Sequence, residues 1–320
     1  MTKPNRVLVI FPGALGDLVC LLPALRSLAR RYQDCGLELM ARAELADFAV
    51  NRMGIVRGHS IDRREVSLLF SPAVDAAAGA EEFFGAFSAI HSFFGFGDPR
   101  PREVLIQACR GVVVFHPFRP AGGGHVSTAY LEALDAAGSE IDIRLGANGS
   151  TPMPCEGIEL RSEDLASARQ LVAECGLSEG RFVLLLPGSG SPAKNWPAES
   201  YLELGRRLGE SSAVLTVLGP AEERLISTFA GLKCLWNPSL GALAGLARLA
   251  SAFVANDSGV AHLAAASGGQ GVVIFGPTDP LRWRPMGRVV VLRRMLLRDL
   301  TWQEVAAALG NLPGRAESGR

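Results

Sequence analysis

The stretch VLVIFPGALGD at residues 7–17 decides the fold of this chain. Its first five residues are all apolar, as expected of a strand that is buried on both faces of a sheet. A turn with Gly13 and Gly16 follows at once, and a helix with leucines along one face begins at Asp17 and runs to residue 31. A strand, a glycine turn and a helix in this order predict a parallel α/β sheet, with a candidate ligand site at the turn.

The same alternation of apolar runs and amphipathic stretches continues along the chain. In the first half we expect further strands at residues 37–40, 89–94 and 111–115. In the second half we expect strands at residues 182–186, 213–218, 234–236, 252–255, 272–275 and 289–292. Helical patterns cover residues 163–175, 198–208, 240–249 and 258–266. The fold class is therefore α/β, with a doubly wound parallel sheet in each half.

The length of the chain fits two domains. Its 320 residues exceed the roughly 100–200 residues that one domain usually holds. A stretch rich in Gly and Pro, residues 146–158, separates the two predicted sheets. We therefore expect one domain at residues 1–150 and a second at residues 151–300. The sequence TWQE at residues 301–304 is a capping box, which predicts a last helix at about residues 301–310.

Composition excludes several classes of protein. The 32 Lys and Arg residues balance 32 Asp and Glu residues, so the chain lacks the basic excess that nucleic acid binding needs. No uninterrupted apolar run is long enough to span a membrane, and the N-terminus lacks the core of a signal peptide, so we expect a cytoplasmic protein. The six Cys and five His residues show no metal-ligand spacing, so we expect no metal site.

Asp17 stands at the first candidate site, directly after the glycine turn. It has two interpretations on spacing alone. A carboxylate in the first turn of a helix is favoured by the helix dipole and needs no other role. A carboxylate at the mouth of a cleft between two domains can also act as a general base. The turn lacks the GxGxxG pattern, so it does not predict a dinucleotide site.

The second candidate site is PGSGSPAKNWP at residues 187–197, which again follows a predicted strand. Its small residues, Ser189, Gly190 and Ser191, let a backbone approach an anion closely, and Lys194 supplies a compact positive charge. The spacing of a P-loop is absent. A flexible connector with a solvated lysine is the alternative interpretation.

Further candidate residues follow other strands of the second half. The sequence NDSGVAH at residues 256–262 opens a helix whose free N–H groups suit phosphate, although Asp257 or Ser258 can also be a plain N-cap and His262 a core residue. Glu222 follows the predicted strand at residues 213–218. The sequence FGPTDPLRW at residues 275–283 continues from the end of the predicted strand at residues 272–275. Segments that follow parallel strands meet at one sheet edge, so these groups predict a pocket for a nucleotide-diphosphate sugar.

These motifs together resemble glycosyltransferase family 9, the ADP-heptose:lipopolysaccharide heptosyltransferase family. The resemblance rests on the motifs quoted above, on LPAL at residues 22–25, on LGPAE at residues 218–222 and on NDSGVAHLAA at residues 256–265. It implies a GT-B fold, in which two Rossmann-like domains face a cleft, the first binding the acceptor and the second the donor. The last helix would pack back onto the first domain.

The resemblance also implies an inverting transfer of heptose from ADP-heptose to lipopolysaccharide core or a related surface glycan, without a metal or other cofactor. Asp17 would be the general base, and Lys194 would stabilise the leaving diphosphate together with the N–H groups of Ser258, Gly259 and Val260. Glu222 would bind the ribose and Asp257 the sugar hydroxyls. The remaining nucleotide-sugar contacts would come from Gly13, Gly16, Ser189, Gly190, Ser191 and His262.

The partners implied are the nucleotide-sugar donor and a lipid-linked glycan acceptor, with no nucleic acid. We expect a monomer that contacts the cytoplasmic face of the inner membrane through its acceptor. The residues that bind the acceptor within the range 43–150 are not identified by the motifs. Three other functions stay open: a transferase that uses another nucleotide sugar, a nucleotide-sugar epimerase, and a catalytically silent relative that only binds the nucleotide.

Overall fold

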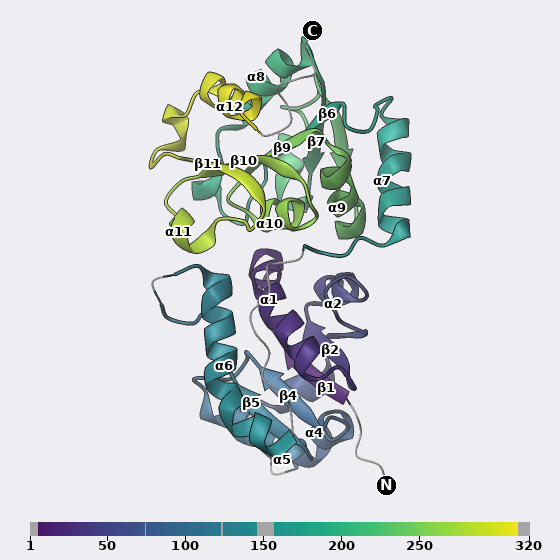
Figure 1. The fold of residues 1–320 in the computed structure, drawn as a ribbon, viewed down its shortest axis with the longest axis vertical. Helices are drawn as coiled ribbons and strands as arrows, with labels where there is room; N and C mark the ends of the chain where they lie inside the picture. Colours follow the sequence, from purple (N-terminus) through teal and green to yellow (C-terminus); the bar gives the residue numbers. More distant parts are fainter. Residues whose placement is uncertain (1–5, 74, 123, 146–156, 313–320) are drawn as a thin grey trace. The chain divides into compact units, whose positions relative to one another are not determined.

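The computed structural model describes residues 6–73, 75–122, 124–145 and 157–312. The chain divides into two compact units, Met1–Cys155 and Glu156–Arg320. Each unit has its own sheet with helices around it (Figure 1). The predicted boundary between residues 150 and 151 lies outside the described residues.

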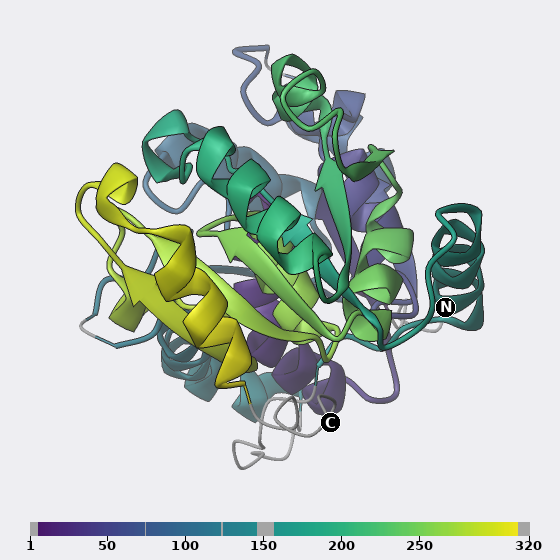
Figure 2. The ribbon, with the colours of Figure 1, turned by 90° about the horizontal axis from the view of Figure 1, so that it is seen from above.

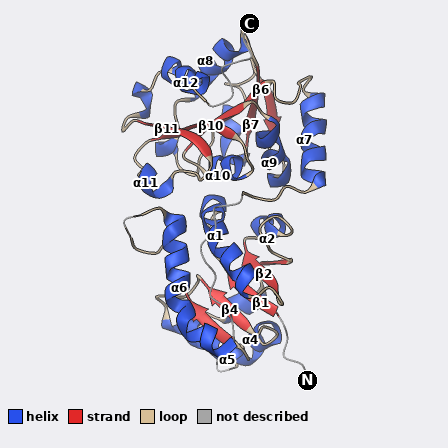
Figure 3. Ribbon diagram, viewed as in Figure 1, coloured by secondary structure: helices blue, strands red, loops and turns tan. Residues whose placement is uncertain are grey.

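The first unit is built on a five-stranded sheet in the order β3-β2-β1-β4-β5, and all its strands are parallel. Figure 3 draws the strands in red and the helices around them in blue. Strand β1 is flanked by β2 and β4, and residues 7–10 of β1 are completely buried, as the apolar run at residues 7–11 predicts. The strands are β1 (Arg6–Ile10), β2 (Gly36–Ala41), β3 (Arg57–Ser60), β4 (Ala89–Ser92) and β5 (Val112–Phe115). The helices are α1 (Leu15–Arg31), α2 (Ala43–Ala49), α3 (Arg64–Leu68), α4 (Ala76–Phe84), α5 (Pro99–Ala108) and α6 (Val126–Leu145).

The second unit holds a six-stranded parallel sheet in the order β11-β10-β9-β6-β7-β8. Its strands are β6 (Phe182–Leu186), β7 (Ala213–Leu218), β8 (Lys233–Trp236), β9 (Ala252–Asn256), β10 (Gln270–Phe275) and β11 (Arg288–Arg293). Its α-helices are α7 (Ser162–Glu174), α8 (Ala198–Gly209), α9 (Leu240–Leu249), α10 (Gly259–Ala266), α11 (Pro280–Trp283) and α12 (Trp302–Gly310). Short 3₁₀ turns are η1 (Pro192–Lys194), η2 (Pro220–Leu225) and η3 (Leu297–Asp299).

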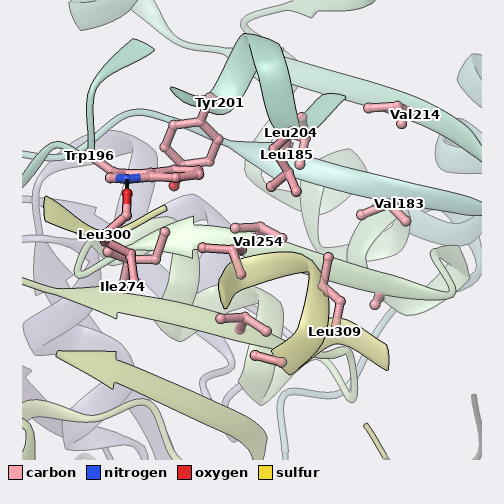
Figure 4. Close-up of a cluster of buried hydrophobic side chains, with 14 of the residues drawn as sticks. Val183, Leu185, Trp196, Tyr201, Leu204, Val214, Val254, Ile274, Leu300 and Leu309 are labelled. Atoms are coloured by element: carbon pink, nitrogen blue, oxygen red, sulfur yellow. Dashed lines mark hydrogen bonds between the residues drawn. The ribbon is translucent and has the colours of Figure 1, made fainter. Parts of the chain in front are cut away.

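The last helix, α12, belongs to the core of the second unit. Its predicted capping box is present, because Thr301 Oγ1 accepts from the Glu304 N–H at 3.3 Å and Glu304 accepts from the Thr301 N–H at 2.9 Å. Val305 and Leu309 are buried among side chains of β6, α8 and β10, and α12 lies alongside α8 (Figures 2 and 4). The apolar stripe of this helix is buried within the second unit, and its predicted packing onto the first domain stays a prediction.

The described helices bear on the question of membrane insertion. None of them combines the length and the apolar character that a bilayer crossing requires. The longest, α6, carries Glu132 and Asp135 among its described side chains and lies against α1.

Candidate functional site

The strand order of the second sheet fixes where a ligand site is expected. The chain winds outward from β6 through β7 to β8 on one side, and from β9 through β10 to β11 on the other. The winding reverses between the neighbours β6 and β9. Ligands of doubly wound sheets bind outside the carboxyl ends of the strands at such a reversal. The segments at this point are residues 187–197, which we call the lysine loop, and residues 257–262 at the start of α10.

A charged pair joins these two segments. Lys194, at the end of η1, places its Nζ 2.8 Å from Asp257 Oδ2, although 63 residues separate them along the chain. The Asp257 side chain is only 5% exposed, whereas that of Lys194 is 33% exposed. The buried carboxylate is therefore neutralised by a lysine whose ammonium group can still meet an incoming anion. The structure brings together two side chains to which the sequence assigned separate roles.

Helix α10 begins beside this pair. Ser258 is its N-cap, with an extended backbone, and its Oγ accepts from the Ala261 N–H at 3.3 Å. Of the two candidates for the cap, Asp257 and Ser258, the structure therefore selects Ser258. Gly259 and Val260 form the first turn, where N–H groups have no carbonyl of an earlier turn to bond. His262 lies one turn further, buried at 5% exposure.

The lysine loop is held in shape from within and from both sides. Ser189 Oγ donates to the Ser191 carbonyl at 2.7 Å and accepts from the Ser191 N–H at 3.2 Å. Gly190 has open space around it. On one side, a Cβ at Gly188 would lie 2.4 Å from the Glu222 carboxyl carbon. On the other, a Cβ at Gly276, which follows β10, would lie 3.3 Å from the Ala193 carbonyl oxygen.

Glu222 lies at the carboxyl end of β7, in the first turn of η2. Its Oε2 accepts from the Gly219 N–H at 2.9 Å, so the carboxylate caps its own turn. Burial raises the pKa of Glu222, and the hydrogen bond from Gly219 lowers it in part. Because the carboxylate packs on the Gly188 backbone, it belongs to the same sheet edge as the Lys194–Asp257 pair.

Asp17 belongs to the first unit, together with Gly13 and Gly16. It stands in the first turn of α1, where its Oδ2 accepts from the Ala14 N–H at 3.2 Å. Arg119 approaches the same oxygen at 3.9 Å. Gly13 is required by packing, since a Cβ there would lie 2.3 Å from the Phe11 ring. The side chain of Asp17 is 12% exposed. Its hydrogen bond from Ala14 fits the interpretation as a carboxylate of the first helical turn. This bond uses Oδ2, so Oδ1 is the oxygen that the interpretation as a general base would require.

A buried histidine pair lies near the Asp17 turn. The ring of Phe93 packs on Phe11 at 5.6 Å and on His116 at 4.8 Å between centroids. His116 Nε2 lies 3.0 Å from His91 Nδ1, and His91 Nε2 lies 3.0 Å from the Tyr32 hydroxyl. Burial lowers the pKa of His116 to about 4 and that of His91 well below its usual range, with the nearby Arg31 adding to both effects. Both imidazoles are therefore neutral at pH 7.

The sequence analysis assigned no role to two residues, one beside Asp17 in the first unit and one beside the lysine loop in the second. Arg119 is the cation closest to Asp17 that the structure records in the described part of the first unit. Asn256 was quoted only as part of a motif, yet its side chain bonds the lysine loop on both sides. The signal for Asn256 was present, because it ends the otherwise apolar strand AFVAN and is completely buried. No group of three His, Cys, Asp or Glu side chains within the described ranges could hold a metal ion.

Comparison with known proteins places these features in a family. Residues 142–298, which carry the lysine loop, Glu222 and α10, match the model of glycosyltransferase family 9 (heptosyltransferase). Over 123 residues the chain is 30% identical to lipopolysaccharide heptosyltransferase 1 of Escherichia coli strain K12. That alignment covers 37% of this chain and 39% of the relative, so it spans well under half of the relative's length.

Solved structures share the fold over nearly the whole chain. The glycosyl transferase family 9 protein of Veillonella parvula DSM 2008 aligns over 98% of both chains, with a TM-score of 0.77 and 16% identity. E. coli heptosyltransferase WaaC, solved with ADP-2-deoxy-2-fluoro heptose, covers 94% of this chain and 98% of its own, with a TM-score of 0.65 and 22% identity. These likenesses confirm the predicted α/β fold of the GT-B type. The sheet order, the motifs at its switch point and the family match agree, and residues 142–298 of the chain match the model of glycosyltransferase family 9.

Proposed function

We propose that this protein is an inverting glycosyltransferase that transfers a heptose from ADP-heptose to lipopolysaccharide core or a related surface glycan. The observation that carries the proposal is the Lys194–Asp257 pair beside the N-terminus of α10, inside the residues that match the family. The name of the curated E. coli relative and the ADP-heptose analogue held by the E. coli structure support the choice of donor and acceptor.

The donor diphosphate would bind between Lys194 and the first turn of α10. The ammonium group and the N–H groups of Ser258, Gly259 and Val260 supply positive potential where charge develops on the leaving diphosphate. Ser189, Gly190 and Ser191 would lie along the phosphates, with His262 behind the turn. Asp257 would accept hydrogen bonds from sugar hydroxyls and Glu222 from the ribose.

The reaction would proceed by direct displacement. An acceptor hydroxyl oxygen forms a bond to the anomeric carbon of the heptose while the bond from that carbon to the diphosphate oxygen breaks. Asp17 takes the proton of the hydroxyl, and ADP leaves with the electron pair of the broken bond. Attack from the face opposite to the leaving group inverts the anomeric centre. The Gly13 and Gly16 turn would position Asp17 for this step.

We further propose that residues 1–150 bind the acceptor and residues 151–300 bind the donor. The acceptor would be lipid-linked, so the protein would act at the cytoplasmic face of the inner membrane. We propose separately that it acts as a monomer. The absence of a basic excess in the sequence argues against nucleic acid as a partner.

Nucleotide preference tests the proposal directly. We expect calorimetric titration to give ADP an affinity at least about tenfold above those of UDP and GDP, a difference of about 1.4 kcal/mol. Binding and turnover should not change with EDTA, because the positive charge of the site comes from Lys194 and α10. Tighter binding of UDP would contradict the heptose donor, and loss of activity with EDTA would contradict metal-independent transfer.

An incubation with ADP-heptose alone separates transfer from epimerisation. An epimerase converts its donor without an acceptor, whereas the proposed transferase requires both. A protein that binds ADP but consumes no donor with any acceptor would be a silent relative. Product analysis by mass spectrometry and NMR distinguishes these outcomes.

A further inference from the structure

The buried side chain of Asn256 joins the two segments that flank the switch point. Asn256 is the last residue of β9 and has no exposed surface. Its Oδ1 accepts from the Trp196 backbone N–H at 3.0 Å and from the Tyr201 hydroxyl at 3.1 Å. Its Nδ2 donates to the Pro187 carbonyl at 2.6 Å. One amide therefore holds both ends of the lysine loop.

The partners of this amide fix its orientation. Two donors, the Trp196 N–H and the Tyr201 hydroxyl, meet the same side-chain atom, so that atom is the oxygen. On the other side, the Pro187 carbonyl and Asn195 Oδ1 are acceptors, at 2.6 and 3.5 Å, so the nitrogen faces them. Burial raises the pKa of Tyr201 well above its usual range, so the hydroxyl keeps the proton that it donates.

The loop is supported on its outer side as well. Trp196 is 1% exposed, and its indole Nε1 donates to the Leu300 carbonyl at 2.9 Å (Figure 4). The Trp196 and Tyr201 rings pack edge to face at 4.9 Å between centroids. The indole thus anchors the end of the loop to the chain before α12, while Asn256 anchors it to β9. Of these two anchors, the second connects the loop to β9, the strand that directly precedes Asp257.

We propose that Asn256 is a positioning residue that sets the separation of Lys194 and Asp257 and thereby shapes the site for the donor diphosphate. Asp257 is the next residue in the chain, and Lys194 lies two residues before Trp196, so both members of the pair are tied to this one amide. The inference rests on the proposed function, because binding of the diphosphate at Lys194 is part of that proposal.

The chemistry of the amide explains why close substitutes fail. Asn256→Asp keeps an acceptor for Trp196 and Tyr201 but sets a second oxygen against the Pro187 carbonyl, and two acceptors at this distance repel each other. Asn256→Ser keeps a hydroxyl but is too short to reach both ends of the loop. In each variant Asp257 still follows β9 directly, while the lysine loop loses hydrogen bonds that Asn256 makes to its two ends.

The test is ADP titration of the full chain, with a matched control. We expect Asn256→Asp and Asn256→Ser each to raise the ADP Kd at least about tenfold. Gln270→Glu is the control. Gln270 is the first residue of β10, so it lies at the amino end of that strand, whereas the lysine loop follows the carboxyl end of β6. Its amide donates to the Ser251 carbonyl at 3.2 Å. The same amide-to-acid change there should alter the Kd by less than about twofold.

A double-mutant cycle separates positioning from plain stabilisation of the fold. If Asn256 acts through Lys194, the double variant Lys194→Ala/Asn256→Ser should bind ADP within about threefold of Lys194→Ala alone. If Asn256 only stabilises the second unit, the two losses should multiply. Melting temperatures taken on the same samples show whether a loss of affinity follows a loss of fold.

The outcomes distinguish the inference from the function on which it rests. A wild-type protein that does not bind ADP overturns both. A wild-type protein that binds ADP, with an unchanged Kd in both Asn256 variants or with multiplicative losses in the cycle, overturns the inference alone. If Asn256→Asp fails to fold, Asn256→Ser and the cycle built on it decide the question.

Discussion

Asp17 has two possible tasks, and a single substitution separates them. Its Oδ2 accepts from the Ala14 N–H at 3.2 Å, which caps α1. Asp17→Asn keeps an oxygen that can accept this bond but removes the group that can take a proton. We expect transfer to fall by about 10²- to 10⁴-fold, the usual contribution of a general base. ADP affinity and melting temperature should stay at the wild-type values in calorimetry.

The opposite result for Asp17 has a clear meaning. Turnover close to wild type in Asp17→Asn would reduce this residue to its helix-capping role. Asp17→Ala provides the reference for that role, because removal of a carboxylate that caps a first turn costs about 1 kcal/mol of stability.

Gly188 tests the contact between the lysine loop and Glu222. In Gly188→Ala, the new Cβ would lie 2.4 Å from the Glu222 carboxyl carbon, so the carboxylate must move. We expect a loss of about 1–3 kcal/mol in stability, as for other overpacked sites, and an ADP affinity lowered about tenfold. Urea unfolding and calorimetric titration measure the two effects.

Gly231→Ala is the matched control for this change. Gly231 lies in the same unit, and nothing stands within 4 Å of the Cβ it would gain. Its stability should stay within about 0.5 kcal/mol of wild type. Equal ADP affinities in Gly188→Ala and Gly231→Ala would remove Glu222 from the nucleotide site.

At the scale of elements, the histidine pair lies in β4 and directly after the neighbouring strand β5, and it gives the first unit a pH-dependent stability. The pKa of His116 is about 4 in the folded chain, against about 6.5 for an unfolded histidine. As the pH falls, His116 therefore takes up a proton at a higher pH in the unfolded chain than in the folded chain. Stability should be complete above about pH 6.5 and fall as the pH drops toward 4, by about 3 kcal/mol for His116.

His116→Gln tests the origin of this slope. Glutamine can still bond His91 but does not titrate, so urea unfolding at about pH 7 and about pH 5 should show a smaller difference than in wild type. An unchanged slope would assign the pH dependence to other groups.

Sequence patterns located most elements but not their ends. Apolar runs identified β6, β7, β9 and β10 because those strands are buried on both faces. Strand β3, with the sequence RGHS, was missed, since an edge strand with polar side chains has no apolar run. The helical pattern predicted a start at residue 163, whereas α7 begins at Ser162 with Arg161 as its N-cap, and Asp164 accepts the Arg161 N–H at 2.9 Å. Local pattern cannot choose between neighbouring polar residues at a helix start.

At the scale of the whole molecule, the two parallel sheets followed from the alternation of strand and helix, whereas contacts between distant segments did not. The Lys194–Asp257 pair exists because β6 and β9 are neighbours in the sheet. The order of the strands cannot be predicted from the sequence of the lysine loop or of residues 257–262. The surface that covers the apolar stripe of α12 could not be predicted for a related reason. An amphipathic helix predicts that one face is buried but not against which surface, and here the surface is that of β6, α8 and β10.

The Lys194–Asp257 pair also has a consequence for which anions Lys194 can bind. A lysine without a counter-ion would attract any small anion, whereas here each anion competes with a carboxylate that is fixed to the chain and 5% exposed. Chloride or another monoanion gains little from that exchange. A polyanion that reaches both the ammonium group and the start of α10 gains from two contacts at once. The pair therefore favours polyanions over monoanions at this sheet edge.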